Sequence, residues 1–204
     1  VALELTLLRV GRTEVRPVFM LETWYEGEHS SPPERVRRQA YWPYLCGAMG
    51  QFFGNNPIWL FNPGWPTALE SQGSKDMERL HAAFAGREWW RLEPDQNHTV
   101  VTAGFGSYTT SDYVTAARAD DGRLVLAYLP STGIGTRTLT VNMGMLSAPA
   151  AAQWYNPASG SYTRISGSPF ANTGSRNFTT LGNNGTGTND WLLVLAVGAS
   201  GNRG

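Results

Sequence analysis

The pattern of apolar and polar positions changes near residue 97, and the part before it alternates between strand and helix periods. Residues 17–21 form a continuous apolar run that is typical of a buried strand. Two helices are predicted, over 31–49 and 74–86, because apolar residues recur there every three or four positions. A short strand is predicted at 50–54. This order predicts a βαβα unit, which normally belongs to a parallel sheet with helices outside.

Local signals indicate where both helices begin and end. Ser31 and Glu34 have the spacing of a capping box, and Pro32 suits the first helical position. Pro43 interrupts the first helix, so we expect a kink or a local break there. Gly86 is expected to end the second helix.

The later part shows short alternating segments separated by turn residues. The dipeptide at 121–122, Asp-Gly, lies between two strand patterns and is a strong hairpin signal. Further strands are predicted over 136–143 and 189–197, where apolar residues alternate or run continuously. About six to eight short strands in such a segment are typical of an antiparallel β-sandwich.

Composition supports a division into a mixed α/β domain at 1–97 and an all-β domain at 98–204. Six of the eight tryptophans lie in the first domain, and the second is rich in Gly, Ser, Thr and Asn. Sixteen basic and sixteen acidic residues cancel, which argues against a nucleic-acid partner. We expect neither a signal peptide nor a membrane-spanning segment within this sequence.

Cysteine and histidine provide no pattern for metal or thiol chemistry. Cys46 is the only cysteine, so we expect no disulfide within the chain and no cysteine-based metal site. Its apolar neighbours favour a small buried side chain over a nucleophile. The spacing of His29, His81 and His98 suggests no ligand set, and no glycine-rich phosphate loop follows a strand. No cofactor is therefore expected.

The strand predicted at 17–21 is followed by a carboxylate, Glu22, in aromatic surroundings. A partly desolvated carboxylate is hydrogen-bonded, ion-paired or functional. Retaining glycosidases use one carboxylate as nucleophile and a second as acid/base, and aromatic rings offer flat faces for sugars. The region 22–65 supplies this mixture in Trp24, Tyr25, Trp59, Phe61, Trp65, Asn55, Asn56 and Asn62. An ordinary aromatic core has a similar composition, so both interpretations stay open.

Three segments of the first domain resemble a known family. They are "RPVFMLETWYEG" at 16–27, "VRRQAYWPYLCGAMGQFFGNNPIW" at 36–59 and "SQGSKDMERLHAAFAGREWWRLEPD" at 71–95. They are similar to the last third of the apiosidase-like glycoside hydrolases, which are (β/α)₈ barrels of a retaining clan. In the second domain, "RADDGRLVLAYLP" and "NDWLLVLAV" resemble the β-sandwich, labelled as collagen-binding, that follows this barrel. The resemblance implies the C-terminal portion of a barrel, with strands seven and eight, followed by that sandwich.

The resemblance also implies roles for individual residues. Glu22 matches the carboxylate after strand seven and is the candidate nucleophile, while Glu26 and Tyr25 are expected to orient it or contact sugar hydroxyls. Gln51 stands where the family often has histidine. Arg37 and Tyr41 fit the helix motif, and helix packing is the favoured role for both. The candidate catalytic residues are Glu22 and Glu26, and the candidate substrate-binding residues are Trp24, Tyr25, Gln51, Asn55, Trp59 and Trp65.

The chain is short for the enzyme that the resemblance implies. A (β/α)₈ barrel takes about 250 residues, whereas only 1–97 precede the expected sandwich. Strands one to six and the strand-four acid/base are therefore expected from the same longer protein or from another chain. The implied enzyme cleaves glycosidic bonds in plant or microbial polysaccharide, outside the cell or in the periplasm. We expect this chain alone to be inactive.

An alternative function is a non-catalytic carbohydrate-binding or structural module. Trp154, Tyr155 and Tyr162 are the candidate sugar-binding aromatics of the second domain, whereas Trp191 fits a core position. We favour a structural brace for the barrel over glycan binding, and nothing in the strand pattern recommends collagen binding.

Overall fold

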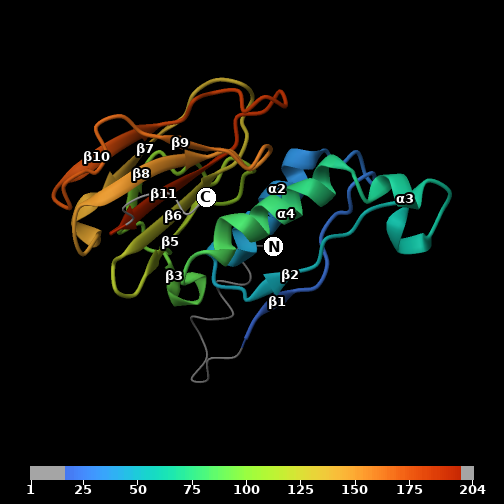
Figure 1. The fold of residues 1–204 in the computed structure, drawn as a ribbon, viewed down its shortest axis with the longest axis horizontal. Helices are drawn as coiled ribbons and strands as arrows, with labels where there is room; N and C mark the ends of the chain where they lie inside the picture. The colour runs from blue at the N-terminus through green and yellow to red at the C-terminus, as the bar shows by residue number, and fades with distance from the viewer. Residues whose placement is uncertain (1–16, 199–204) are drawn as a thin grey trace.

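The computed structural model describes residues 17–198 (Figure 1). The first part consists of β1 (Phe19–Met20), α2 (Pro33–Leu45), β2 (Gly50–Gln51), a 3₁₀ turn (Ile58–Leu60), α3 (Trp65–Ala68), α4 (Gln72–Ala85) and a second 3₁₀ turn (Trp89–Arg91). The second part consists of β3 (Leu92–Pro94), β4 (Val101–Ala103), β5 (Thr115–Ala119), β6 (Leu124–Leu129), β7 (Thr138–Asn142), a 3₁₀ turn (Met143–Met145), β8 (Ala150–Tyr155), β9 (Tyr162–Arg164), β10 (Ser175–Thr179) and β11 (Trp191–Val197).

The first part is a parallel pair of strands joined by a helix. β1 pairs with β2 in parallel, Phe19 opposite Gly50, and α2 makes the crossover between them. Gly50 lets the Phe19 ring lie directly against the backbone of β2, because a Cβ atom at this position would clash with that ring. The pairing spans only two residues of the predicted apolar run, and Leu21 is 70 % exposed. The predicted order of strand, helix, strand, helix is confirmed.

The two long helices begin by different means. Ser71 caps α4 and accepts a hydrogen bond from the Ser74 amide at 3.2 Å. The capping box predicted for α2 is wrong, because Pro32 occupies the N-cap and Ser31 lies one position too early. The Ser31 hydroxyl has no hydrogen-bond partner. Helix α2 continues through Pro43 and ends two residues later, at Leu45.

The second part consists of two antiparallel sheets that enclose an apolar core. One sheet has the order β3-β5-β6-β11-β8-β9, and the other has the order β10-β7-β4. The predicted hairpin is confirmed, since β5 and β6 pair around Gly122, whose φ is 71°. Side chains of both sheets meet in the core, among them Leu139, Val141, Phe178, Val125, Leu193 and Trp154.

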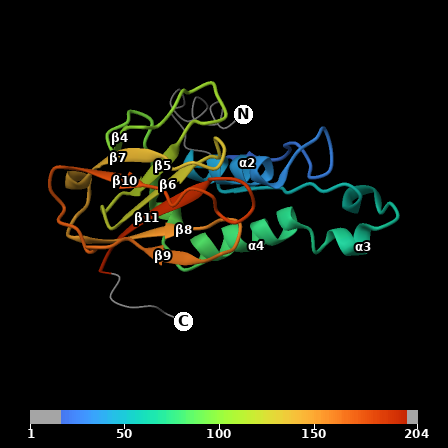
Figure 2. The same ribbon diagram turned by 90° about the horizontal axis from the view of Figure 1, so that it is seen from above.

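Helices α2 and α4 cover the outer face of the six-stranded sheet (Figure 2). Tyr41 of α2 stacks on Tyr128 of β6, with ring centroids 4.5 Å apart and planes 5° from parallel. Phe84 of α4 packs in the same cluster. The short helix α3 lies at the end of the molecule away from the sheets (Figures 1 and 2). Helix α2 also contacts β2 of the parallel pair, so it lies between that pair and the six-stranded sheet.

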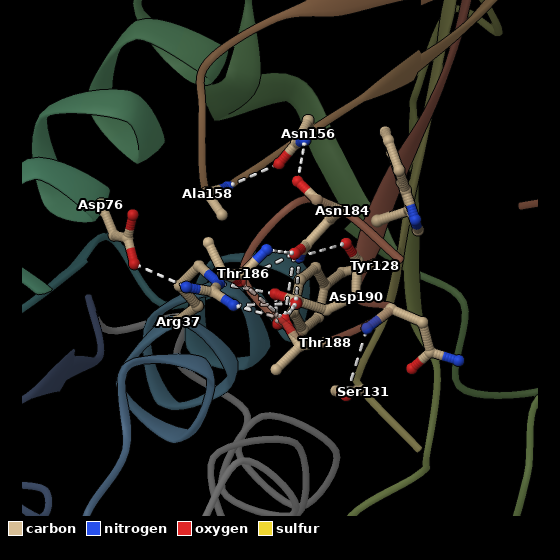
Figure 3. Close-up of polar contacts among 12 residues, drawn as sticks. Arg37, Asp76, Tyr128, Ser131, Asn156, Ala158, Asn184, Thr186, Thr188 and Asp190 are labelled. Carbon is tan, nitrogen blue, oxygen red and sulfur yellow. Dashed lines mark hydrogen bonds and ion pairs between the residues drawn. The ribbon is translucent and has the colours of Figure 1, made fainter. Parts of the chain in front are cut away.

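A buried ionic network joins the helices to the second part (Figure 3). The Arg37 side chain, 1 % exposed, donates to Asp76 of α4 at 2.7 Å and to Asp190 at 2.6 Å. Asp190 also accepts from the Tyr128 hydroxyl at 3.0 Å. Burial opposes the charged form of Arg37, but the hydrogen bond and charge of Asp190 outweigh it and raise the pKa of the guanidinium. Arg37 therefore has the packing role favoured by the sequence.

Two aromatics that were candidates for glycan binding are inside the protein. Trp154 is 2 % exposed between the two sheets, and Tyr155 is 1 % exposed beneath the helices. Neither side chain is accessible to a sugar, so that hypothesis is wrong for both. The strand pattern does not reveal that both faces of this sheet are covered. Tyr162 remains on the surface, and Trp191 lies in the core as expected.

Candidate active site

A pocket of about 680 Å³ opens beside the carboxyl end of β1. The loop after β1 supplies Glu22, Trp24, Tyr25 and Glu28, and the 3₁₀ turn after β2 supplies Trp59. The outer wall comes from α2, which contributes Arg35, Arg38, Gln39 and Trp42. Strand ends of parallel units gather functional groups in this way, because the loops that follow neighbouring strands meet at one edge.

Glu22 is exposed at the pocket and receives a hydrogen bond from its own loop. The Tyr25 hydroxyl donates to Glu22 Oε1 at 3.3 Å. Desolvation raises the pKa of the Tyr25 hydroxyl, and the Glu22 carboxylate adds to the shift. Tyr25 therefore stays protonated and remains a donor to the carboxylate at neutral pH.

An aromatic ring and a second acid line the side of the pocket next to Tyr25. Trp59 meets Tyr25 edge to face, with ring centroids 6.0 Å apart and planes at 84°. Its indole nitrogen donates to Glu28 Oε1 at 3.0 Å, and Asn56 Nδ2 donates to the same oxygen at 3.1 Å. Trp59 is 52 % exposed, so its ring presents a free surface.

Cationic side chains form the wall on the α2 side. The Arg35 guanidinium lies 4.3 Å from the Trp24 ring centroid. The centroid of the His29 ring lies 5.4 Å from the same Trp24 centroid. Arg38 lies 5.4 Å from the Trp42 ring. Burial lowers the pKa of Arg38, and the charge of Arg35 acts in the same direction. The pocket thus combines two carboxylates, cations and aromatic faces.

Glu26 points away from this pocket, toward the amino end of α4. It accepts hydrogen bonds from Ser71 Oγ at 2.6 Å, the Gly73 amide at 2.9 Å and Asn55 Nδ2 at 2.8 Å. Its backbone pairs with Gly54 and Asn56, which extends the parallel pairing of β1 and β2. A carboxylate at a helix amino end is stabilised by the helix dipole and the free amides. In this structure Glu26 connects the loop after β1 to α4.

Three further candidate residues also lie outside the pocket lining. Asn55 is 4 % exposed and is bound to Glu26 and Ser71. Gln51 donates to the Met77 sulfur at 3.2 Å. Trp65 begins α3 and contacts Phe61. The structure therefore gathers Glu22, Trp24, Tyr25 and Trp59 into one pocket, and leaves Glu26, Gln51, Asn55 and Trp65 around it.

Two family models match the chain one after the other. Residues 4–91 match "Apiosidase-like, catalytic domain", and residues 94–196 match "Putative collagen-binding domain of a collagenase". The second match covers about half of the chain, and the two together cover nearly all of it. The chain belongs to the family of this C-terminal domain, and the segment before it matches the apiosidase-like catalytic domain. The resemblance found in the sequence is thereby confirmed.

Two solved structures of glycoside hydrolases resemble this chain. One is named "Glycoside hydrolase" and has a TM-score of 0.76, and a glycoside hydrolase family 5 protein from Bacteroides vulgatus ATCC 8482 has a TM-score of 0.77. Each is 25 % identical in sequence to this chain, and each alignment covers 93 % of it. The alignments cover only 44 % and 43 % of the two relatives. The chain thus spans less than half the length of these relatives. No curated protein sequence matches it.

Several residues that line the pocket were not among the candidates predicted from the sequence. Glu28 was missed although it lies in the same short loop as Glu22 and Glu26. Arg35 and Arg38 belong to the arginine-rich start of α2, and their 3-residue spacing, which puts both on one helix face, was an available signal.

In the described residues no group of three or more His, Cys, Asp or Glu side chains could hold a metal. No helix of residues 17–198 is long and apolar enough to cross a membrane.

Glu26→Ala is expected to destabilise the chain by about 1–3 kcal/mol, because it leaves the Gly73 amide without its side-chain acceptor and removes one of the two acceptors of Asn55 Nδ2. Urea unfolding followed by circular dichroism measures the change. Glu78→Ala is the control, since Glu78 is an exposed acid of α4, the helix whose amino end Glu26 contacts, and its loss is expected to be nearly neutral. Equal stability of the two variants would contradict the role given to Glu26.

Proposed function

We propose that this chain supplies one part of a retaining glycoside hydrolase, with Glu22 as the catalytic nucleophile. The observation that carries the proposal is the position of Glu22 after a parallel strand, in a pocket with Tyr25, Trp24 and Trp59. The Tyr25 hydrogen bond orients the carboxylate, and the indole rings offer faces for a sugar. The match of residues 4–91 to the apiosidase-like catalytic domain supports this interpretation.

We further propose that β1 and β2 are the seventh and eighth strands of a (β/α)₈ barrel whose other strands lie outside this chain. Apolar side chains near the pair are exposed, among them Leu21 at 70 %, Met49 at 52 % and Phe52 at 58 %. The remaining strands, from the same longer protein or a second chain, would cover them. A strand pair without neighbours offers unpaired backbone groups, which favours such an addition.

The acid/base is proposed to come from the part of the barrel that lies outside this chain. In retaining enzymes the two catalytic carboxyl groups are about 5–5.5 Å apart, on either side of the scissile bond. Glu28 is already bound by Trp59 and Asn56, and Glu26 is bound at the amino end of α4. These contacts give both acids a structural role, which favours an acid/base from outside this chain.

The two antiparallel sheets are proposed to form a sandwich that braces the catalytic part. Helices α2 and α4 bury apolar surface against the six-stranded sheet, and Arg37 is ion-paired across the junction. The alternative is a carbohydrate-binding module, but two of its three candidate aromatics, Trp154 and Tyr155, are buried. The proposed substrate is a plant or microbial polysaccharide, which the enzyme would meet outside the cell or in the periplasm.

The proposal is tested by comparing this chain with a polypeptide that includes the missing strands. We expect turnover of aryl glycosides or plant polysaccharide by the complete protein only, with retained configuration at the anomeric carbon. Proton NMR of the first product distinguishes the two anomers. Formation of the inverted anomer, or equal turnover by this chain alone, would contradict the proposal.

A further inference from the structure

Glu28 is the acid that joins the two loops around the pocket. Its Oε1 atom accepts from the indole nitrogen of Trp59 at 3.0 Å and from Asn56 Nδ2 at 3.1 Å. The Glu28 amide donates to the Tyr25 carbonyl at 3.2 Å, and the Ser31 amide donates to the Glu28 carbonyl at 2.8 Å. The backbone of this acid is thus held on the side of β1, while its side chain holds the loop after β2.

The Trp59 ring is half exposed, so packing alone does not enclose it. It lies on a 3₁₀ turn of three residues and is 52 % exposed. An exposed indole ring of this kind can adopt several rotamers. A hydrogen bond from the ring nitrogen to an ionised carboxylate is stronger than a neutral one and selects one of them.

The orientation of Trp59 also affects the environment of Glu22. Trp59 packs edge to face on Tyr25, and the Tyr25 hydroxyl donates to Glu22 Oε1 at 3.3 Å. Glu28 therefore acts on the pocket through two neighbouring rings. Both donors bind the same carboxylate oxygen, Oε1, and together they fix the orientation of the carboxylate.

We propose that Glu28 is the positioning residue that holds Trp59 as the sugar-stacking wall of the pocket. This inference rests on the proposed glycosidase function and adds a determinant of substrate binding to it. A saccharide ring stacked on the free face of Trp59 would lie beside Tyr25 and Glu22. Loss of Glu28 would weaken binding of that ring more than it would slow the chemical step.

The contact itself is tested on this chain by the indole N–H signals in a proton–nitrogen NMR spectrum, with Trp59 assigned through Trp59→Phe. Glu28→Ala is expected to move the Trp59 signal upfield, and Glu28→Gln, whose amide oxygen still accepts, to restore part of the shift. Trp42 and Trp191 donate to the carbonyls of Tyr113 and Gly182. Their signals should stay in place if the fold is intact.

The consequence for the substrate is tested in the complete protein. Glu28→Ala is expected to raise KM roughly tenfold and to change kcat by less than about threefold, with Glu28→Gln in between. Glu70→Ala is the matched control in both measurements, since this exposed acid of the same region pairs with Lys75 at 3.3 Å, and it should change neither.

The outcomes separate this inference from the proposed function. An unmoved Trp59 signal in Glu28→Ala would overturn the inference whatever the activity. A moved signal with unchanged KM, or with a fall confined to kcat, would overturn it as well. If the complete protein has no glycosidase activity, the proposed function fails, and the NMR experiment alone decides whether Glu28 positions Trp59.

Discussion

Replacing Glu22 by glutamine in the complete enzyme is expected to lower kcat by at least about 10³-fold, because the amide cannot form the covalent glycosyl intermediate. Glu22→Gln keeps the shape of the side chain, and the new amide oxygen can still accept from the Tyr25 hydroxyl. Binding of a substrate or inhibitor, measured by titration calorimetry, should therefore stay within about tenfold of the unmodified enzyme. Glu93→Gln is the control, since Glu93 is exposed on β3, far along the chain from the pocket residues.

Rescue by azide tests whether Glu22 is the nucleophile or the acid/base. In Glu22→Ala a cavity replaces the carboxylate, and azide can attack the anomeric carbon from that side while the glycosidic oxygen leaves with a proton from the acid/base. The expected product is a glycosyl azide with the configuration opposite to that of the substrate. A glycosyl azide of retained configuration would place Glu22 on the acid/base side, and turnover of Glu22→Gln within about tenfold of normal would exclude a nucleophilic role.

The order of elements was predictable because it rests on local periodicity. Helix α4 runs over Gln72–Ala85, close to the predicted 74–86, and the Asp-Gly turn at 121–122 joins β5 to β6. The capping box failed for a local reason too. Ser31 and Glu34 have the required spacing, but proline, with its fixed φ, occupies the cap position between them.

The candidate site was predictable where its residues follow one strand and not where two segments meet. Glu22, Trp24 and Tyr25 lie in one loop, so their proximity follows from the sequence. The hydrogen bond between Trp59 and Glu28 joins residues 31 positions apart, and no local pattern indicates it. In the same way, the burial of Trp154 depends on the second sheet, which strand alternation alone does not place.

The ionic network between α2 and the sheets was beyond prediction for the same reason, and it has a large expected effect on stability. Arg37 and Asp190 are separated by 153 positions and are both buried. Arg37→Ala is expected to lower the free energy of unfolding by about 3–5 kcal/mol, because it leaves Asp190 as a buried charge without its cation. Urea unfolding, followed by tryptophan fluorescence, measures the loss.

Arg91→Ala is the matched control for this prediction, since Arg91 also pairs with carboxylates, including Asp120 at 2.7 Å, but its side chain is 34 % exposed. Water screens such a pair, so its loss should cost less than about 1 kcal/mol. Asp190→Asn should partly rescue Arg37→Ala, because it removes the uncompensated charge and keeps an acceptor for Tyr128.

If the sheets brace the catalytic part, the Arg37→Ala chain unfolds first at the junction, and its unfolding transitions by fluorescence and by circular dichroism separate. The contrary outcome is that the two transitions coincide and that the free energy of unfolding falls no more than in Arg91→Ala. Arg37 would then contribute no more than a surface ion pair, and the sheets would not act as a brace for the catalytic part.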